Sequence, residues 1–259
     1  MARTLAEIRR ELQAADRTRF EALARALAAD ERKGVRQAVA VARRRLEAEE
    51  AEAARIASLY SLQSELAGGG MAAGLDEVGR GPVAGPLTVA CVVLPDAPRI
   101  AGLNDSKQLS PERREELAAQ VESIALAWSI EHIPPDEIDA CGMSACLRVA
   151  FERALRAVEG QGQAVDAVLL DGNPLHLDAR ERNVVKGDAK IACISAASII
   201  AKVARDALMR DYAREYPEYG FEANKGYASA EHIAAIREHG LCPIHRATFC
   251  RAWTQEPLF

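Results

Sequence analysis

The sequence contains no long apolar run. The longest such runs among its 259 residues, for example Leu87 to Leu94, fall far short of the roughly 20 residues that a membrane-spanning helix needs. The opening segment, MARTLAEIRR, reaches charged side chains at once and includes no apolar stretch of the kind found in secretory signals. We therefore expect a cytoplasmic protein.

Paired metal-binding residues of the common zinc types are also missing. The six cysteines form no C-x-x-C pair, and the five histidines form neither an H-E-x-x-H motif nor a pair four residues apart. These gaps argue against a zinc site and against a redox-active dithiol. We expect the cysteines to be buried, reduced thiols. We expect the histidines, including His232 and His245, to be hydrogen-bonded structural residues.

The chain lacks a strong excess of charge of one sign. It has 33 Lys and Arg against 38 Asp and Glu, a net charge of −5, and 49% hydrophobic residues. That hydrophobic share is ordinary for a folded globular protein and excludes wholesale disorder. A weakly acidic protein can still bind a polyanion if its basic residues are grouped and metal ions neutralise some carboxylates. Net charge therefore does not exclude a nucleic-acid partner.

A helical segment comes first along the chain. Thr4 and Glu7 have the spacing of a capping box, and Gly34 interrupts the pattern before a longer helical stretch from Val35 to Leu66. The three consecutive glycines at positions 68–70 then break any helix. We predict a small all-helical N-terminal module over residues 1–67, a glycine linker over residues 68–71, and a second domain over residues 72–259 that includes a C-terminal helical region.

The second domain alternates between strand and helix patterns. Ser110-Pro111 is a typical helix start, with an N-cap residue followed by proline at the first helical position. Strands are predicted at residues 72–76, 87–94, 124–133 and 165–170, and helices at residues 143–158 and 195–212. Strands mixed with crossover helices predict an α/β fold, with a mixed sheet flanked by helices.

The most informative passage is GLDEVGRGPVAGP, residues 74–86. Asp76 and Glu77 end an apolar strand, and burying two neighbouring acids is costly unless a cation offsets them. The glycines that follow expose backbone N–H groups to a ligand. Adjacent strand residues point to opposite faces, so both side chains cannot reach one metal site from a regular strand. Either the strand ends at Asp76, or Glu77 contributes differently, for instance through its backbone carbonyl.

Two further carboxylates lie at similar places. Asp171 follows a buried strand, and Asp188 precedes the helix predicted from Ser195, although each alone also fits a turn residue or a helix cap. Ser198 and Lys202 share one helical face with Ser195, which fits either a phosphate-contacting surface or a solvated stripe. Four carboxylates at strand and loop ends suit a phosphodiester hydrolase that uses two Mg²⁺ or Mn²⁺ ions.

The motifs, taken in order, resemble ribonuclease HII over roughly residues 72–250. The matching segments are GLDEVGRGPVAGP, NDSKQLS, LLDGNP, VVKGDAKIACISAASIIAKVARD, NKGYASAEH and GLCPIHRATF. The resemblance implies a ribonuclease H-like fold and dependence on Mg²⁺ or Mn²⁺. It implies an endonuclease that cuts 5′ of ribonucleotides in RNA–DNA hybrids and of single ribonucleotides in duplex DNA, leaving a 3′-hydroxyl and a 5′-phosphate. Such an enzyme serves in DNA repair and in RNA primer removal.

The resemblance also assigns roles to individual residues. The four catalytic, metal-binding acids of the family fall on Asp76, Glu77, Asp171 and Asp188. The element that reads the 2′-hydroxyl falls on Gly79, Arg80 and Gly81, the substrate tyrosine falls on Tyr227, and lysines near the backbone phosphates fall on Lys107 and Lys202. A 2′-hydroxyl both donates and accepts hydrogen bonds, so a reader needs backbone amides and carbonyls close by.

The remaining basic residues are less specific. Arg246, Lys225 and Arg237 fit either a duplex-binding surface or ordinary solvated charge. The N-terminal module carries three consecutive arginines at positions 43–45, which fit extra contact with the duplex. The module fits equally well as a part that docks on the second domain. Protein partners are not indicated.

Three other functions compete with this hypothesis. A ribonuclease HIII-like enzyme would cut hybrids but handle single ribonucleotides poorly, and the Gly79-Arg80-Gly81 loop favours the HII type. A hybrid-binding protein without catalysis would not need four intact carboxylates. A transposase or integrase of the same fold would act on all-DNA duplexes and need no 2′-hydroxyl.

Overall fold

The computed structural model describes residues 3–254. The last five residues of the predicted second domain and the first two of the N-terminal module lie outside this range. The chain divides into two compact units, Met1–Ala57 and Ser58–Phe259. No helix among the described residues is long and apolar enough to cross a membrane. The division predicted at the glycine segment remains a prediction about domains.

The first unit is a cluster of helices. It comprises α1 (Leu5–Ala14), α2 (Arg17–Ala26) and most of α3 (Lys33–Leu66). The predicted capping box at Thr4 is present, and Asp16 caps α2 by accepting a hydrogen bond from the Arg19 amide at 2.8 Å. Apolar side chains from all three helices pack together, among them Ile8, Phe20, Val35 and Leu46. Gly34 does not interrupt the helix, because it lies in the first turn of α3.

The last turns of α3 belong to the second unit. The Tyr60 hydroxyl accepts a hydrogen bond from the Ile100 amide at 3.2 Å, and the Gln63 side chain accepts one from the Cys193 amide at 2.9 Å. The glycine segment that follows is a turn closed by backbone hydrogen bonds, such as the one from Gly69 to Ser64 at 2.9 Å. This turn leads directly into the first strand.

Five strands form one mixed sheet. They are β1 (Ala72–Val78), β2 (Leu87–Val93), β3 (Ala127–Ile133), β4 (Ala167–Asp171) and β5 (Glu181–Val184), in the order β3-β2-β1-β4-β5. β2 pairs antiparallel with both β1 and β3, whereas β1–β4 and β4–β5 are parallel. The predicted α/β architecture is confirmed. The short edge strand β5, ERNV, was not among the predicted strands because it has no alternating apolar pattern.

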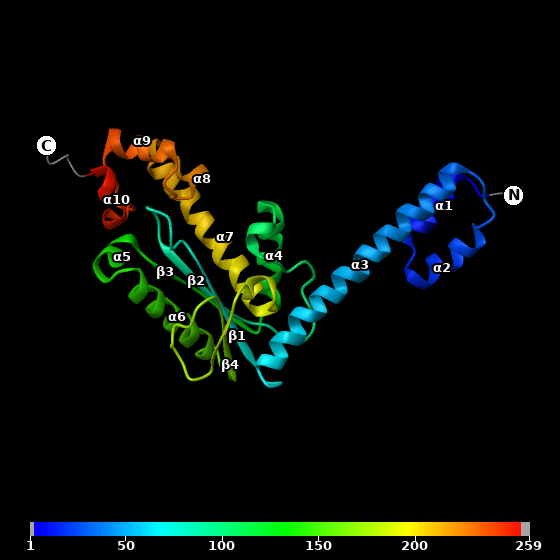
Figure 1. Ribbon diagram of the computed structural model, residues 1–259, viewed down its shortest axis with the longest axis horizontal. Coiled ribbons are helices and arrows are strands. Elements are labelled where there is room, and N and C mark those ends of the chain that lie inside the picture. Colours follow the sequence, from blue (N-terminus) through cyan, green and yellow to red (C-terminus); the bar gives the residue numbers. More distant parts are fainter. Residues whose placement is uncertain (1–2, 255–259) are drawn as a thin grey trace. The chain divides into compact units, whose positions relative to one another are not determined.

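One face of the sheet is covered by α5 (Pro135–Cys141) and α6 (Met143–Glu159), as Figure 1 shows. Ala73 and Leu75 of β1 point to this face and join a core that includes Phe151, which is 1% exposed. Side chains of a strand alternate between faces, so Gly74 and Asp76 lie on the opposite side of β1. This alternation decides which helix each carboxylate meets.

The opposite face is covered by α7 (Ala192–Glu215), with α4 (Pro111–Ile124) beside it (Figure 1). The helix lies very close to the sheet, because a Cβ atom on Gly74 would stand 2.3 Å from the backbone carbon of Cys193. Only glycine therefore fits at this position. The close approach buries the first turns of α7, including Ser195 and Ser198.

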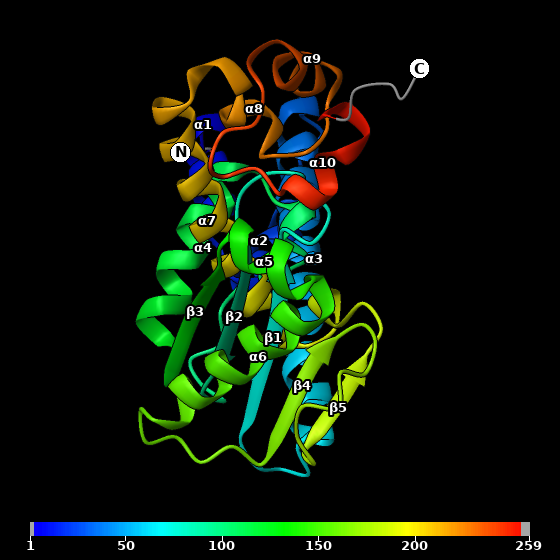
Figure 2. The same ribbon diagram turned by 90° about the vertical axis from the view of Figure 1, so that its left-hand side faces the viewer.

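The remaining elements are short helices. The elements are η1 (Ser106–Gln108), η2 (Gly187–Ala189), η3 (Pro217–Tyr219), α8 (Phe221–Asn224), α9 (Ala230–His239) and α10 (Ala247–Thr254). Figure 2 shows α8, α9 and α10 together at one end of the second unit. The Nε2 atoms of the buried residues His232 and His245 lie 3.0 Å apart, which confirms that both are hydrogen-bonded structural residues. All six cysteines are free, and Cys141 is exposed, contrary to expectation.

Candidate active site

Two of the predicted acids meet at the carboxyl ends of neighbouring strands. Leu75 of β1 is paired with Leu170 of the parallel strand β4, so the next residues, Asp76 and Asp171, stand side by side at the same edge. Asp76 is 8% exposed and accepts a hydrogen bond from the Glu77 amide at 2.8 Å. Asp171 accepts one from the Gly187 amide at 2.7 Å. The sheet therefore brings together two residues that are far apart in sequence.

Glu77 lies within β1, so alternation directs its side chain to the face opposite that of Asp76. β1 continues to Val78, so the expectation that the strand ends at Asp76 is wrong. The carboxylate of Glu77 forms an ion pair with Arg80 at 3.2 Å. Burial raises the pKa of Glu77, although the positive charge of Arg80 works in the opposite direction. The alternative in which Glu77 contributes through its carbonyl remains a prediction.

Asp188 reaches the same region from η2. It is 7% exposed and lies before α7, but it does not cap that helix, whose N-cap is Ile191 and has no side-chain capping bond. Its backbone carbonyl accepts a hydrogen bond from the buried Ser195 hydroxyl. The interpretation of Asp188 as a helix cap is therefore wrong, and the carboxylate is left to interact with its acidic neighbours.

The four carboxylates form one electrostatic cluster around Asp171. Burial, followed by the charge of Glu77, raises the pKa of Asp76 well above its ordinary value. Burial is also the main cause of the raised pKa of Glu77 and of Asp188. The charge of Asp171 adds to the upward shift in all three groups. Such crowding of buried acids favours a cation among them.

The donor set fits a hard divalent cation. It consists of carboxylate oxygens alone, which Mg²⁺ and Mn²⁺ prefer over nitrogen and sulfur ligands. In residues 3–254, no three Asp, Glu, His or Cys side chains are grouped closely enough to hold an ion as they stand. The hydrogen bond to Asp171 and the ion pair of Glu77 with Arg80 engage oxygens that a metal would use. Carboxylates without a cation between them also repel one another.

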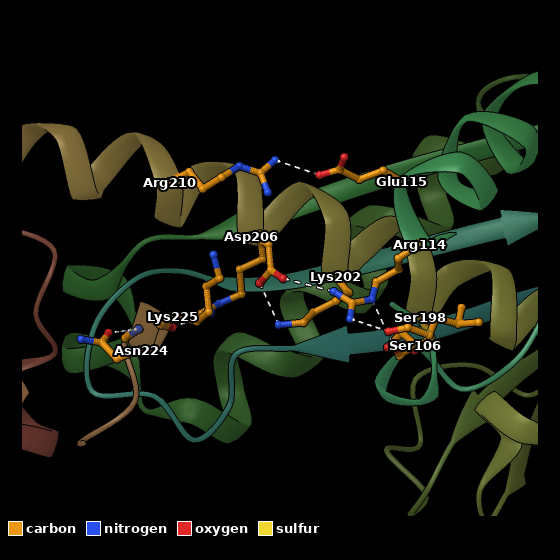
Figure 3. Close-up of polar contacts among 12 residues, drawn as sticks. Ser106, Arg114, Glu115, Ser198, Lys202, Asp206, Arg210, Asn224 and Lys225 are labelled. Carbon is orange, nitrogen blue, oxygen red and sulfur yellow. Dashed lines mark hydrogen bonds and ion pairs between the residues drawn. The ribbon is translucent and has the colours of Figure 1, made fainter. Parts of the chain in front are cut away.

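A network of charged and polar side chains lies along α7 (Figure 3). Asp206, 8% exposed, accepts contacts from Lys202 at 2.7 Å and from Arg114 of α4 at 3.4 Å. One turn before Lys202, the Ser198 hydroxyl donates to that of Ser106 at 3.0 Å, and its proximity to Asp76 lowers the pKa of that carboxyl. The predicted polar face of α7 is therefore divided, because its serines are buried against neighbouring segments and only its lysine extends toward solvent.

The glycine-arginine-glycine loop and Tyr227 are neighbours. Arg80 and Gly81 are exposed, and a Cβ atom on Gly81 would stand 3.7 Å from the Tyr227 ring. The Tyr227 side chain is 52% exposed, so it is not the buried core residue that would have been the alternative. Its backbone carbonyl lies 2.8 Å from Nδ1 of His232. The Tyr227 ring and the loop of Arg80 and Gly81 are therefore adjacent and exposed to solvent.

The other basic residues predicted to bind the substrate differ in their exposure and contacts. Lys107 is exposed in η1, and its charge lowers the pKa of Asp188, so it lies near the acidic cluster. Asp105, which was not among the predicted site residues, raises that same pKa through its charge. Arg237 is exposed in the last turn of α9. In the first unit, Arg45 bonds the Ala15 carbonyl at 2.7 Å and therefore holds its own helices together.

Arg246 is not a surface residue. The expectation that it could add to a duplex-binding surface is wrong, because it is 0% exposed and donates to carbonyl oxygens of the loop at residues 79–85. Arg205 is likewise 0% exposed and was missed entirely. The signal that could have found Arg205 is a basic residue within the apolar stretch ASIIAKVARDALM.

Comparisons with known proteins agree with this geometry. The family pattern described as Ribonuclease HII matches residues 73–252, and the one described as Ribonuclease HII N-terminal domain matches residues 4–67. The ribonuclease HII of Pelotomaculum thermopropionicum is 41% identical over 260 residues, which cover 95% of this chain and 93% of the relative. That of Halalkalibacterium halodurans is 41% identical over 225 residues, which cover 86% of this chain and 84% of the relative.

The fold agrees as well. The crystal structure of the ribonuclease H2 from Pyrococcus horikoshii OT3 is similar with a TM-score of 0.60 and 29% identity, covering 71% of this chain and 96% of that one. The mixed five-stranded sheet with flanking helices, preceded by α1–α3, is therefore ribonuclease H-like, as predicted. The chain belongs to the ribonuclease HII family and is an enzyme of the ribonuclease H type.

Proposed function

We propose that this enzyme hydrolyses the phosphodiester on the 5′ side of ribonucleotides, both in RNA–DNA hybrids and where a single ribonucleotide is embedded in duplex DNA. The products are a 3′-hydroxyl and a 5′-phosphate. The observation that carries the proposal is the cluster of Asp76, Glu77 and Asp188 around Asp171, in which Asp76 and Asp188 are buried, beside the exposed loop of Arg80 and Gly81. Its cellular role is the removal of ribonucleotides and RNA primers from DNA.

Asp76, Glu77, Asp171 and Asp188 would hold two divalent cations, Mg²⁺ or Mn²⁺. When bound, the cations supply electrostatic stabilisation of charge on the phosphodiester and lower the pKa of water. The protein contributes the placement of the acids. The register of β1 and β4 sets Asp76 against Asp171, and the bond from Ser195 to the Asp188 carbonyl fixes η2.

The loop and Tyr227 recognise the ribonucleotide. The backbone of Arg80 and Gly81 can exchange hydrogen bonds with a 2′-hydroxyl, which DNA lacks. The half-exposed ring of Tyr227 lies beside Gly81, where it can pack against the sugar. Recognition by two elements from distant parts of the chain restricts cleavage to a position where a 2′-hydroxyl is present.

Lys107 and Lys202 contact the backbone phosphates. Lys107 is exposed next to Asp188, and Lys202 is held one turn beyond Ser198 by its ion pair with Asp206. Phosphate contacts fix the position of a duplex on a protein without reading its sequence. The two lysines therefore set the register of the strand at the acidic cluster.

The function is tested with a duplex that contains one ribonucleotide, incubated with and without Mg²⁺ or Mn²⁺. We expect a single incision immediately 5′ of the ribonucleotide, with a 3′-hydroxyl on one product, and none without the metal. An all-DNA duplex of the same sequence is the control. Cleavage of long hybrids without incision at the single ribonucleotide would favour a ribonuclease HIII-like enzyme. Binding without any cleavage would contradict the proposal.

Replacing Lys202 with glutamine is expected to weaken duplex binding about equally for all sequences. Loss of one phosphate contact lowers the slope of log K against log salt concentration by about 1. The measurement is a titration of a labelled duplex at several salt concentrations. Arg156→Gln, an exposed change on α6 at the other face of the sheet, is the control and leaves the slope unchanged. An unchanged slope in the Lys202 variant would remove this residue from the phosphate-contacting set.

A further inference from the structure

The buried side chain of Arg246 supports the glycine-arginine-glycine loop through hydrogen bonds. Its guanidinium donates hydrogen bonds to the carbonyl oxygens of Gly79 at 2.6 Å, Pro82 at 2.7 Å, Gly85 at 2.8 Å and Arg80 at 3.2 Å. All five bonds that it makes, including a second one to Gly85 at 3.1 Å, end on this loop. One side chain therefore organises most of the turn between β1 and β2.

Arg205 of α7 joins the loop to the segment that carries Tyr227. It donates to the carbonyls of Pro86 at 2.9 Å and Ala84 at 3.0 Å, and to the carbonyl of Lys225 at 2.9 Å. The loop amide of Val83 bonds the carbonyl of Gly226 at 2.8 Å, which fastens the same two segments. Both candidate recognition elements thus share one buried guanidinium.

These two arginines are unusual because they are buried without a carboxylate partner. Both are 0% exposed, and neither forms an ion pair within the described chain. Burial lowers the pKa of Arg246 to about 10, so the group is still cationic at neutral pH. A buried charge is costly unless it is paired or fully hydrogen-bonded. Here backbone carbonyls accept all the hydrogen bonds that the structure gives the two guanidinium groups, and the Phe249 ring lies 5.3 Å from that of Arg246. The orientation of the carbonyls and the buried charges therefore depend on each other.

The orientation of the carbonyls decides where the amides point. In a trans peptide unit, the C=O and the following N–H point in opposite directions. Because the carbonyls of Gly79 and Arg80 turn inward to Arg246, the N–H groups of Arg80 and Gly81 turn outward. Neither N–H donates a hydrogen bond to any group in residues 3–254, whereas the amides of Val83 and Gly85 both do. Two adjacent free amides form a site for an oxygen ligand.

We infer that Arg205 and Arg246 are positioning residues for recognition of the ribonucleotide. They turn the loop carbonyls inward and so present the Arg80 and Gly81 amides, together with Tyr227, to the 2′-hydroxyl side of the substrate. This inference rests on the proposed function and extends it. The preference for a ribonucleotide over a deoxyribonucleotide depends on two side chains that the substrate does not touch.

The test replaces each arginine with lysine, which keeps the positive charge but offers a single nitrogen in place of the guanidinium fork. Binding is measured in Ca²⁺, to a duplex with one ribonucleotide and to the all-DNA duplex of the same sequence. Arg246→Lys and Arg205→Lys are expected to lower the preference for the ribonucleotide about tenfold, since each lost hydrogen bond to a charged group is substantial. Affinity for the all-DNA duplex should change by less than about twofold. Arg251→Lys, an exposed change on α10, is the control and keeps the full preference.

Each outcome either supports or overturns the inference that Arg205 and Arg246 are positioning residues. Folded lysine variants that keep the full preference, or that lose affinity equally for both duplexes, would overturn the inference while the proposed function stands. Wild-type protein that neither incises nor prefers the ribonucleotide duplex would overturn both. If the lysine variants do not fold, as judged by circular dichroism and thermal melting, the amide resonances of Arg80 and Gly81 in the wild-type protein give the answer. They should shift with the ribonucleotide duplex and not with DNA, and equal shifts with both would reject the inference.

Discussion

Replacing Asp76 with asparagine is expected to abolish cleavage, lowering kcat by about a thousandfold or more, because one metal ligand supplies several kcal/mol of stabilisation. Asp76 is buried, and both burial and the charges of Glu77 and Asp171 raise its pKa. An amide keeps the size of the side chain but not its negative charge. Duplex binding should survive, since the lysines that contact phosphates are unchanged. The measurement is single-turnover cleavage alongside duplex affinity.

The same variant should be at least as stable as the wild type without metal. Burial and the charges of Glu77 and Asp171 disfavour the ionised form of Asp76, so a neutral residue relieves repulsion. We expect a gain of about 1 kcal/mol in the free energy of unfolding. Added Mg²⁺ should then raise the melting temperature of the wild type more than that of the variant, because a ligand of the folded state stabilises it.

Asp211→Asn, an exposed change on α7, is the matched control for Asp76→Asn and should alter neither cleavage nor the effect of metal on the melting temperature. Unchanged cutting by the Asp76 variant would refute the assignment of this carboxylate to the metal site. An unstable variant would instead mean that the charge of Asp76 supports the fold.

Replacing Gly79 with alanine is expected to cost about 3 kcal/mol of stability and to reduce cleavage by about a hundredfold. Gly79 has φ +93°, a conformation that L-residues rarely adopt. A Cβ atom would stand 2.4 Å from Nε of Arg205 and 2.6 Å from the Pro86 carbonyl. Both neighbours are buried and hydrogen-bonded to each other, so they cannot move apart without breaking the support of the loop.

The control for Gly79→Ala is Gly162→Ala. Gly162 has a similar φ of +89°, but nothing lies within 4 Å of its added Cβ atom. This control measures backbone strain alone and should cost about 1 kcal/mol, with cleavage unchanged. Chemical denaturation and single-turnover kinetics give the two quantities. If both variants lost the same stability and the same activity, contact with Arg205 would not be the cause.

The secondary structure could be predicted because its signals are local. The apolar runs near residues 87–94 and 165–170 became β2 and β4 with shifts of a residue or two at their ends, and the Ser110-Pro111 start became α4. β5 was not predicted because three of its four residues are polar, so this edge strand has no periodic apolar pattern. Gly34 misled the prediction because a glycine is well tolerated in the first turn of a helix.

The candidate site was predictable in its residues but not in its arrangement. Adjacent acids followed by glycines pointed to Asp76 and Glu77, and the order of motifs pointed to the family. The sequence could not show that Glu77 stays within a strand and pairs with Arg80, because that depends on how far β1 continues beside β2. Nor could it show that Asp206 gathers Lys202 and Arg114 into one network, because Arg114 comes from another helix.

By itself, the sequence determined most of the longer elements, the family and the identity of the acids, since periodicity, capping residues and contiguous motifs are contained within short stretches of the chain. Tertiary structure alone decided which charges are buried. Arg246 was read as a surface residue, yet its hydrogen-bond acceptors lie up to 167 residues away along the chain. A guanidinium can leave water only when enough carbonyls converge on it, and that convergence exists only after the sheet and α7 have packed. The conformation of the recognition loop therefore depends on long-range contacts that cannot be predicted from a local sequence pattern.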